Sequence, residues 1–144
     1  MRRAAARLCA QLGWAPLHEV TLPNFRRADI FALRADGGLV CIEVKSGMRD
    51  FLGDTKWPDY REFSDALYFA VDDAFPLALL PVAVGLIVAA DGGAGIVREA
   101  PAHKLAPARR RSLLHRFATL AALRLAALED PAGMADLRAA LRSE

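Results

Sequence analysis

Several features that mark particular classes of protein are scarce or absent in this sequence. No apolar run approaches the roughly 20 residues that a transmembrane helix requires, and no internal repeat, linker or low-complexity segment is present. The net charge of +2, from 19 basic and 17 acidic residues, is too small to prove a polyanionic partner. The basic residues are clustered, however, at 2–7, 26–27, 45–61 and 98–124, and a local patch matters more than the total. Only two cysteines occur, Cys9 and Cys41, among apolar neighbours and without a paired spacing. We therefore expect reduced core cysteines and no disulfide.

What the sequence does contain is typical of a cytoplasmic globular domain. The chain has 144 residues, of which 54% are hydrophobic and 25% charged, so it can bury a core and is not expected to be disordered. Its first residues place arginines before apolar residues, as a signal peptide does, but Arg7 and Gln11 interrupt the apolar stretch. Apolar spacings of three and four instead predict a helix over residues 2–12, ended by Gly13.

Charged residues interrupt two consecutive apolar strands. Residues 29–34 and 38–45 have strand patterns separated by an Asp-Gly-Gly turn, with Asp29 at the start of the first and Glu43 and Lys45 at the end of the second. Burying a charge is strongly unfavourable unless a partner or a metal compensates. We therefore expect the three charges to act together.

The register of these two strands decides whether the charges can meet. Glu43 and Lys45 are two residues apart and point to the same face of a strand. A loop of three or five residues centred on Asp36 places Asp29 opposite Glu43 on that face. A two-residue turn pairs Asp29 with Val44 and directs it to the other face. We predict the odd-length or bulged loop, because only this version brings the charges together.

Two carboxylates at one strand spacing, about 5 Å, form the hard oxygen pair that Mg²⁺ prefers. A lysine beside such a pair can help to orient and deprotonate an attacking water, or neutralise charge on a phosphate. The alternative is a surface salt bridge between Lys45 and either acid, and these three residues alone do not decide between the two interpretations.

The neighbouring residues carry a family resemblance. Asp29 followed by Glu43-x-Lys45 resembles the PD-(D/E)XK signature of restriction-endonuclease-like nucleases, and KSGMRDFLGDTKWPDY with SDALYFAV resembles the MmcB family of DNA repair proteins within that superfamily. The likeness extends from about residue 4 to about residue 128. Two departures are Ala28, where the signature has proline, and Gly47, where a second serine is expected.

This resemblance implies a metal-dependent nuclease that hydrolyses DNA phosphodiester bonds in repair. Asp29, Glu43 and the backbone carbonyl of Val44 would hold Mg²⁺, with Mn²⁺ as a substitute, and Lys45 would help to orient the attacking water. DNA is the expected partner, together with other repair proteins. The alternative is a non-catalytic DNA-binding module that keeps the nuclease fold, and a nuclease acting on RNA would share the same metal site.

The expected fold is a restriction-endonuclease-like α/β sandwich with a central mixed five-stranded sheet flanked by helices. The two motif strands are followed by strands at 66–71, 85–90 and 95–99, and residues 17–22 also have a strand pattern. Helices are expected at 58–65, from Pro107 onward and at 133–142. Residues 1–130 are predicted to form the nuclease-like domain, and 131–144 a helical extension of it.

Further candidates surround the three central residues. Glu19 could supply a third carboxylate, although a solvent-facing strand residue or a partner for an arginine is the more common role. Asp50 and Asp54 could support Lys45 and Lys56. A mixture of basic and aromatic side chains suits contacts with a nucleic-acid backbone and its bases. The DNA-binding candidates of this kind are Arg26, Arg27, Lys56, Trp57 and Tyr60.

These candidates also have ordinary alternatives. The two arginines could pair with nearby acids, and Trp57 could simply pack in the core. Arg109, Arg110 and Arg111 lie at the start of a predicted helix, where cations oppose the helix dipole. An anionic partner would suit them, although a solvated arginine-rich face is more common.

Overall fold

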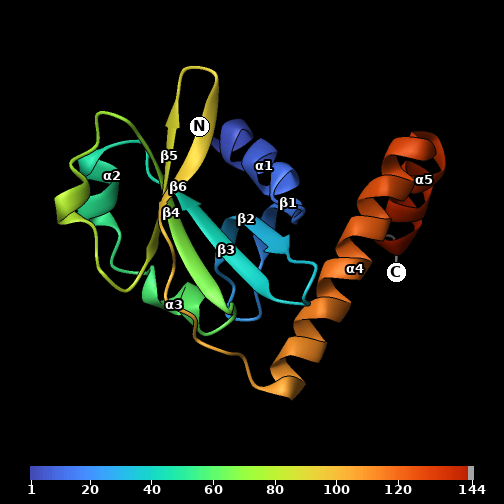
Figure 1. Ribbon diagram of the computed structural model, residues 1–144. Helices are drawn as coiled ribbons and strands as arrows, with labels where there is room; N and C mark the ends of the chain where they lie inside the picture. The colour runs from blue at the N-terminus through green and yellow to red at the C-terminus, as the bar shows by residue number, and fades with distance from the viewer. Residues whose placement is uncertain (143–144) are drawn as a thin grey trace. The chain divides into compact units, whose positions relative to one another are not determined.

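The computed structural model describes residues 1–142 and divides the chain into two compact units, Met1–Pro107 and Ala108–Glu144. The first unit contains a single β-sheet and all the residues that the sequence marked as central to the site (Figure 1). The second unit is helical and is described separately.

The first unit is built on a mixed six-stranded sheet. Its strands follow the chain order across the sheet; β3, β4 and β5 run parallel, and the other neighbours are antiparallel. The strands are β1 (Ala15–Thr21), β2 (Arg27–Leu33), β3 (Leu39–Val44), β4 (Ala66–Asp72), β5 (Gly85–Ala90) and β6 (Gly93–Arg98).

The prediction of five strands was therefore wrong by one. The segment recognised as strand-like at 17–22 belongs to the same sheet, because Ala15–Thr21 pairs with β2 on both sides of Glu19. Pairing with β1 leaves β2 flanked on both sides, so the strand that carries Asp29 is an inner strand of the sheet.

The loop between β2 and β3 has the odd length that the sequence predicted. Leu33 pairs with Leu39, which leaves five residues, 34–38, in the connection. Gly37 adopts a positive φ of 85°, a conformation that glycine accepts without steric cost, and the Asp36 side chain accepts a hydrogen bond from the Gly38 N–H at 2.8 Å. The register that follows pairs Ile30 with Ile42.

The two faces of the sheet are covered by different elements. Helix α1 (Arg2–Gln11) packs on one face, where its Ala5, Leu8 and Cys9 join a buried cluster with Ile30 and Ile42. The other face carries Cys41, Glu43 and Phe69, and is covered by the segment that contains α2 (Met48–Gly53) and α3 (Pro58–Arg61). Figure 1 shows α1 and α2 on opposite sides of the sheet.

Helix α2 was not predicted, since its six residues are too few to show a helical repeat of apolar positions. The aromatic ring of Phe51 fixes it to the sheet, with edge contacts to Phe69 at 6.1 Å and to Phe75 at 6.0 Å between centroids. Such contacts between distant segments are not visible as a local pattern.

The segment that follows α3 is attached to the sheet by a buried acid. Both oxygens of Asp65 accept backbone hydrogen bonds, from Leu39 at 2.8 Å and from Leu105 at 3.0 Å. These bonds join the start of β3 to the chain that leaves β6, so Asp65 has a structural role that the sequence did not reveal.

The second unit consists of two helices, α4 (Pro107–Glu129) and α5 (Pro131–Arg142). Proline is the first residue of each helix. At this position an N–H has no partner within the helix, so its absence in proline costs nothing. The Asp130 side chain accepts a hydrogen bond from the Gly133 N–H at 3.1 Å and so caps the start of α5. Among residues 1–142, no helix is long and apolar enough to cross a membrane.

Candidate active site

The hairpin of β2 and β3 brings Asp29 and Glu43 together at its open end. Glu43 Oε1 accepts a hydrogen bond from the Asp29 backbone N–H at 3.2 Å, and Asp29 Oδ2 accepts one from the Val44 N–H at 2.8 Å. Each carboxylate is thus held by the backbone of the opposite strand. Asp29 Oδ1 and Glu43 Oε2 accept no hydrogen bond from the part of the chain that the structure describes.

Glu43 lies in an environment that opposes its ionisation. Its residue is only 5% exposed. Burial, followed by the negative charge of Asp29, raises the pKa of Glu43 to about 8, although the Asp29 N–H and the Lys45 charge act in the opposite direction. Beneath it, the Cys41 thiol lies 3.8 Å from Glu43 Oε1, and burial with the two acids raises the pKa of Cys41 well above its usual value. A cation bound beside Glu43 would remove the main cost of ionising it.

Lys45 is buried and paired. Its ammonium group binds the Asp54 carboxylate, and the two side chains are only 6% and 13% exposed. The Lys45 Nζ atom also lies 5.4 Å from the centre of the Phe69 ring. Burial alone would raise the pKa of Asp54, but hydrogen bonds from Lys45 and from the Lys56 N–H, together with the Lys45 charge, lower it. Asp54 therefore remains an anion that fixes the lysine in place.

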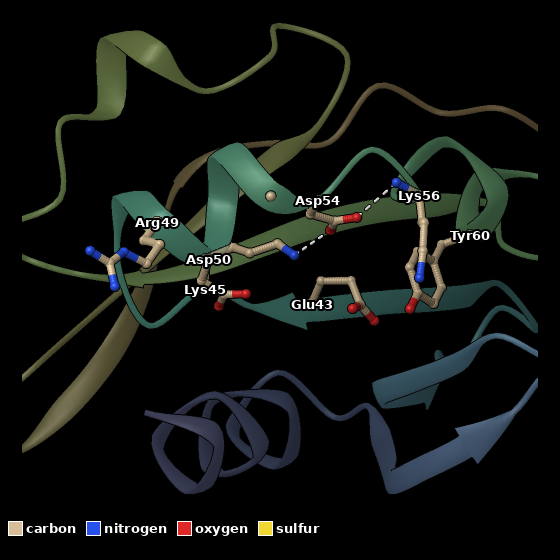
Figure 2. A pocket seen from close by; sticks show the side chains of 8 residues that line it. Glu43, Lys45, Arg49, Asp50, Asp54, Lys56 and Tyr60 are labelled. Carbon is tan, nitrogen blue, oxygen red and sulfur yellow. Dashed lines mark hydrogen bonds and ion pairs between the residues drawn. The ribbon is translucent and has the colours of Figure 1, made fainter.

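A pocket of about 370 Å³ opens over these residues (Figure 2). Figure 2 shows Glu43 and Tyr60 at one end and Arg49 with Asp50 at the other, with the contact between Lys45 and Asp54 lying between them. The lining residues are Glu43, Lys45, Arg49, Asp50, Gly53, Asp54, Lys56 and Tyr60. The pocket thus contains several residues proposed from the sequence, contributed by β3, α2, α3 and the loops that follow β3 and α2.

The pocket also contains a residue that the sequence did not single out. Arg49, on α2, is exposed, and its side chain forms no hydrogen bond or ion pair with residues 1–142. Lys56 likewise presents an ammonium group that has no acidic partner in the described chain, although its backbone N–H donates to Asp54 Oδ1 at 2.8 Å. The only signal for Arg49 in the sequence was its place among clustered basic residues, because the helix that positions it was not foreseen.

The remaining acid of the pocket supports the loop after β3. Asp50 Oδ2 accepts hydrogen bonds from the Ser46 N–H at 3.0 Å and from the Ser46 hydroxyl at 3.3 Å. The sequence proposed that Asp50 and Asp54 support Lys45 and Lys56. In the structure Asp54 contacts both lysines, whereas Asp50 binds the residue that follows Lys45.

The DNA-binding candidates have different environments. Arg26 forms an ion pair with Asp59 at 2.9 Å, whereas Arg27 is exposed and its side chain has no hydrogen-bond or ionic partner within residues 1–142. Tyr60 is 8% exposed and its hydroxyl donates to the Arg27 carbonyl at 3.3 Å, while burial, followed by the charge of Glu43, raises the pKa of that hydroxyl. Trp57 packs edge-on against Phe69, with 6.0 Å between ring centroids.

Glu19 is directed away from the two central acids by the local backbone. Its φ of 50° interrupts the regular pairing between His18 and Val20, and its carboxylate forms an ion pair with Arg2 of α1 at 3.0 Å. Within residues 1–142, no group of three or more His, Cys, Asp or Glu side chains is arranged to hold a metal ion. The carboxylates available at the centre are therefore Asp29 and Glu43.

Comparison with known proteins places this site in a family. Residues 1–132 match the family described as DNA repair protein MmcB-like. The chain belongs to the MmcB-like family. A solved structure, described as the SPO1766 protein of unknown function from Silicibacter pomeroyi, is similar with a TM-score of 0.86 and 44% identity, over 91% of this chain and 90% of that one. No curated protein matches the chain significantly.

Membership of the MmcB-like family confirms the resemblance seen in the sequence and connects the protein with DNA repair. The matched residues include the whole pocket and the β2–β3 hairpin. The solved relative is described as a protein of unknown function, so it indicates the fold of the MmcB-like site but not its chemistry.

Proposed function

We propose that this MmcB-like protein is a cytoplasmic, Mg²⁺-dependent deoxyribonuclease with a restriction-endonuclease-like fold, which hydrolyses phosphodiester bonds in DNA repair. The observation that carries the proposal is the register of β2 and β3, which brings Asp29 beside Glu43. Glu43 in turn lines a pocket that also contains Lys45. Free, buried Cys9 and Cys41 are compatible with a reducing compartment.

The donor set fits a hard divalent cation. Asp29 Oδ1 and Glu43 Oε2 are carboxylate oxygens that accept no hydrogen bond from residues 1–142, and oxygen ligands are those Mg²⁺ prefers. The Val44 N–H points toward Asp29. Because the N–H and C=O of one strand residue point to the same side, the Val44 carbonyl is available there as a third ligand. Mg²⁺ held by these groups would lower the pKa of a water and stabilise the negative charge that develops on the phosphate.

Lys45 would supply a fixed positive charge next to these ligands. Its ammonium is held by Asp54 and by the ring of Phe69, so little side-chain freedom remains to be lost when substrate binds. A cation positioned in advance beside a reacting phosphate stabilises the transition state more than one that has to reorganise. Lys45 would therefore orient the attacking water or the phosphate, and Asp54 would position Lys45.

The exposed cations around the pocket would bind the DNA backbone. Arg27, Arg49 and Lys56 have no acidic partner in the described chain, so they can contact phosphates without first breaking an ion pair. Tyr60 lines the same pocket and could contact a sugar or a base. Arg26 already pairs with Asp59 and is expected to act mainly by fixing the β1–β2 turn.

A cleavage panel tests the proposed function. Labelled DNA and RNA, each as single strand, duplex, flap and junction, are incubated with the full chain in Mg²⁺, Mn²⁺ or EDTA. We expect metal-dependent cleavage of DNA that falls at least about 100-fold in Asp29→Asn, Glu43→Gln and Lys45→Ala, a loss comparable to that of other transition-state contacts. Glu19→Gln is the matched control, since Glu19 pairs with Arg2, and should cut like the parent.

Two results would contradict the proposal. Cleavage that survives in all three site variants would show that a contaminating nuclease, or a different site on this protein, is responsible. Tight DNA binding without any cleavage by the parent protein, in either metal, would favour the non-catalytic DNA-binding module instead.

A further inference from the structure

The turn between β1 and β2 carries an aromatic side chain that makes no contribution to the core. Phe25 is 90% exposed, the highest value among the large hydrophobic residues of the described chain. Its backbone has a φ of 65°, in the left-handed region that glycine and asparagine normally occupy and that is strained for a bulky side chain. Phe25 therefore combines a strained backbone with an exposed ring, and its side chain adds no packing to the core.

The turn holds this ring on a fixed base. The Phe25 N–H donates to the Leu22 carbonyl at 2.9 Å, and the Leu22 N–H to the Arg26 carbonyl at 2.7 Å. The Asn24 side chain donates to the Asp59 carbonyl at 3.2 Å, and Arg26 pairs with the Asp59 carboxylate at 2.9 Å. Because the turn is tied to α3 as well as to itself, placing a ligand on the ring costs little backbone ordering.

The position of the turn connects it with the candidate active site. Phe25 precedes Asp29 by four residues, a span of at most about 14 Å, which corresponds to about four base steps of stacked DNA. Asp59, which anchors the turn, is followed directly by Tyr60 of the pocket, and Tyr60 also donates to the Arg27 carbonyl. The exposed Arg27 guanidinium next to the turn can contact a phosphate. A DNA strand in the pocket therefore has a phosphate contact and an aromatic face within a few nucleotides.

We infer that Phe25 stacks on an unpaired base, so that the substrate contains single-stranded or locally open DNA beside the bond that is cut. This inference rests on the proposed function and specifies its substrate class. Aromatic rings stack on bases of any sequence, whereas the bases of an intact duplex are already stacked on one another. The ring therefore selects for unpaired bases and not for a particular sequence.

Binding in EDTA tests the inference independently of cleavage. The affinity of the full chain for a labelled single-stranded oligonucleotide, and for the same sequence as a duplex, is measured by fluorescence anisotropy. We expect Phe25→Ala to bind the single strand about 10-fold more weakly, which matches the loss of one stacked base, and the duplex less than 2-fold more weakly. Phe25→Trp should bind the single strand as tightly as the parent, whereas Phe25→Leu, which is apolar but has no π face, should bind it as weakly as Phe25→Ala.

Two controls show that the effect belongs to stacking at this position. Val97→Ala truncates an exposed apolar residue, 56% exposed, on the strand at the opposite edge of the sheet, and should leave both affinities unchanged. Phe25→Gly relieves the positive φ, and is expected to melt at the same or a higher temperature than the parent while binding the single strand as weakly as Phe25→Ala.

The inference is overturned if Phe25→Ala binds both DNAs as tightly as the parent, because the ring would then make no contact with DNA. Equal weakening for single strand and duplex, or full recovery in Phe25→Leu, would overturn it as well. Failure of the proposed function would give a different pattern: a parent protein that binds single strands through Phe25 but cuts nothing in Mn²⁺. A protein that cuts DNA while Phe25→Ala binds normally would refute the stacking role alone.

Discussion

The two faces of β3 carry out different tasks with alternate residues of one short strand. On the face toward α1, Val40 and Ile42 are fully buried in an apolar cluster. On the opposite face, Cys41 and Glu43 lie beside Asp29, and Lys45 follows directly beyond the strand. The first face supplies packing energy, and the second carries groups whose burial costs free energy. The contrast indicates that packing on the apolar face offsets the free energy that burial of the charged site costs.

The largest effect on stability is expected from breaking the buried ion pair of the charged face. Asp54→Ala leaves the Lys45 ammonium, 6% exposed, without its partner, and should lower the free energy of unfolding by about 3 to 5 kcal/mol. Chemical denaturation measures this loss, and the cleavage rate should fall with it. The matched control is Glu19→Ala, whose pair with Arg2 is about half exposed and should cost less than about 1 kcal/mol. Equal losses in the two variants would contradict the account.

A loss of similar or slightly smaller size is expected on the apolar face. Ile42→Ala removes a fully buried side chain from the cluster with Ala5 and Cys9 and should cost about 2 to 4 kcal/mol. Denaturant titration gives the value. Under conditions where the variant is folded, its cleavage rate per folded molecule should equal that of the parent, because Ile42 points away from the pocket. A specific loss of cleavage would show that the two faces do not act separately.

The pH dependence of stability should show that Glu43 opposes folding when it is charged. Folding raises the pKa of Glu43 from its ordinary 4.5 to about 8, so the stability associated with its neutral form is present below pH 4.5 and is lost as the pH rises through 8. In EDTA, the parent should lose about 2 to 3 kcal/mol more than Glu43→Gln between pH 6 and pH 9. Glutamine keeps an acceptor for the Asp29 N–H but has no proton to lose. Parallel pH profiles for the two proteins would contradict this expectation.

The smallest effect is expected at the rim of the pocket. Lys56 is exposed and lines the pocket, so Lys56→Ala should weaken DNA binding modestly and reduce the slope of log affinity against log salt by about one ion. Arg3 lies on α1, which covers the opposite face of the sheet, and Arg3→Ala is the matched control of equal charge. Titrations at several salt concentrations measure both slopes, and equal changes would argue against a defined DNA path across the pocket.

Local patterns predicted the part of the structure on which the site depends. The period of two along β2 and β3 separated Ile30 and Ile42 from the acids. The turn composition at Asp36 allowed either loop length, and the odd loop was predicted because only that register brings the charges together; the observed register confirms it. Most strand and helix positions followed the same local signals; the exceptions are the count of strands and helix α2, which was not predicted.

The parts that could not be predicted depend on contacts between distant segments. The pairing of Lys45 with Asp54 requires α2, which is fixed by Phe51 packing on Phe69 and not by a pattern of its own. The direction of Glu19 depends on a left-handed backbone and on Arg2 of a separate helix. In both cases the sequence supplied the residue types, whereas the tertiary packing determined their partners.

The most direct test of the account is the position of a divalent cation in crystals grown with Mn²⁺. We expect an anomalous peak between Asp29 Oδ1 and Glu43 Oε2, within ligand distance of the Val44 carbonyl, and its disappearance in Glu43→Gln. A well-ordered site that shows no peak there at saturating Mn²⁺ would contradict the claim that Asp29 and Glu43 hold one cation. A Mn²⁺ ion bound only by other residues would contradict it as well.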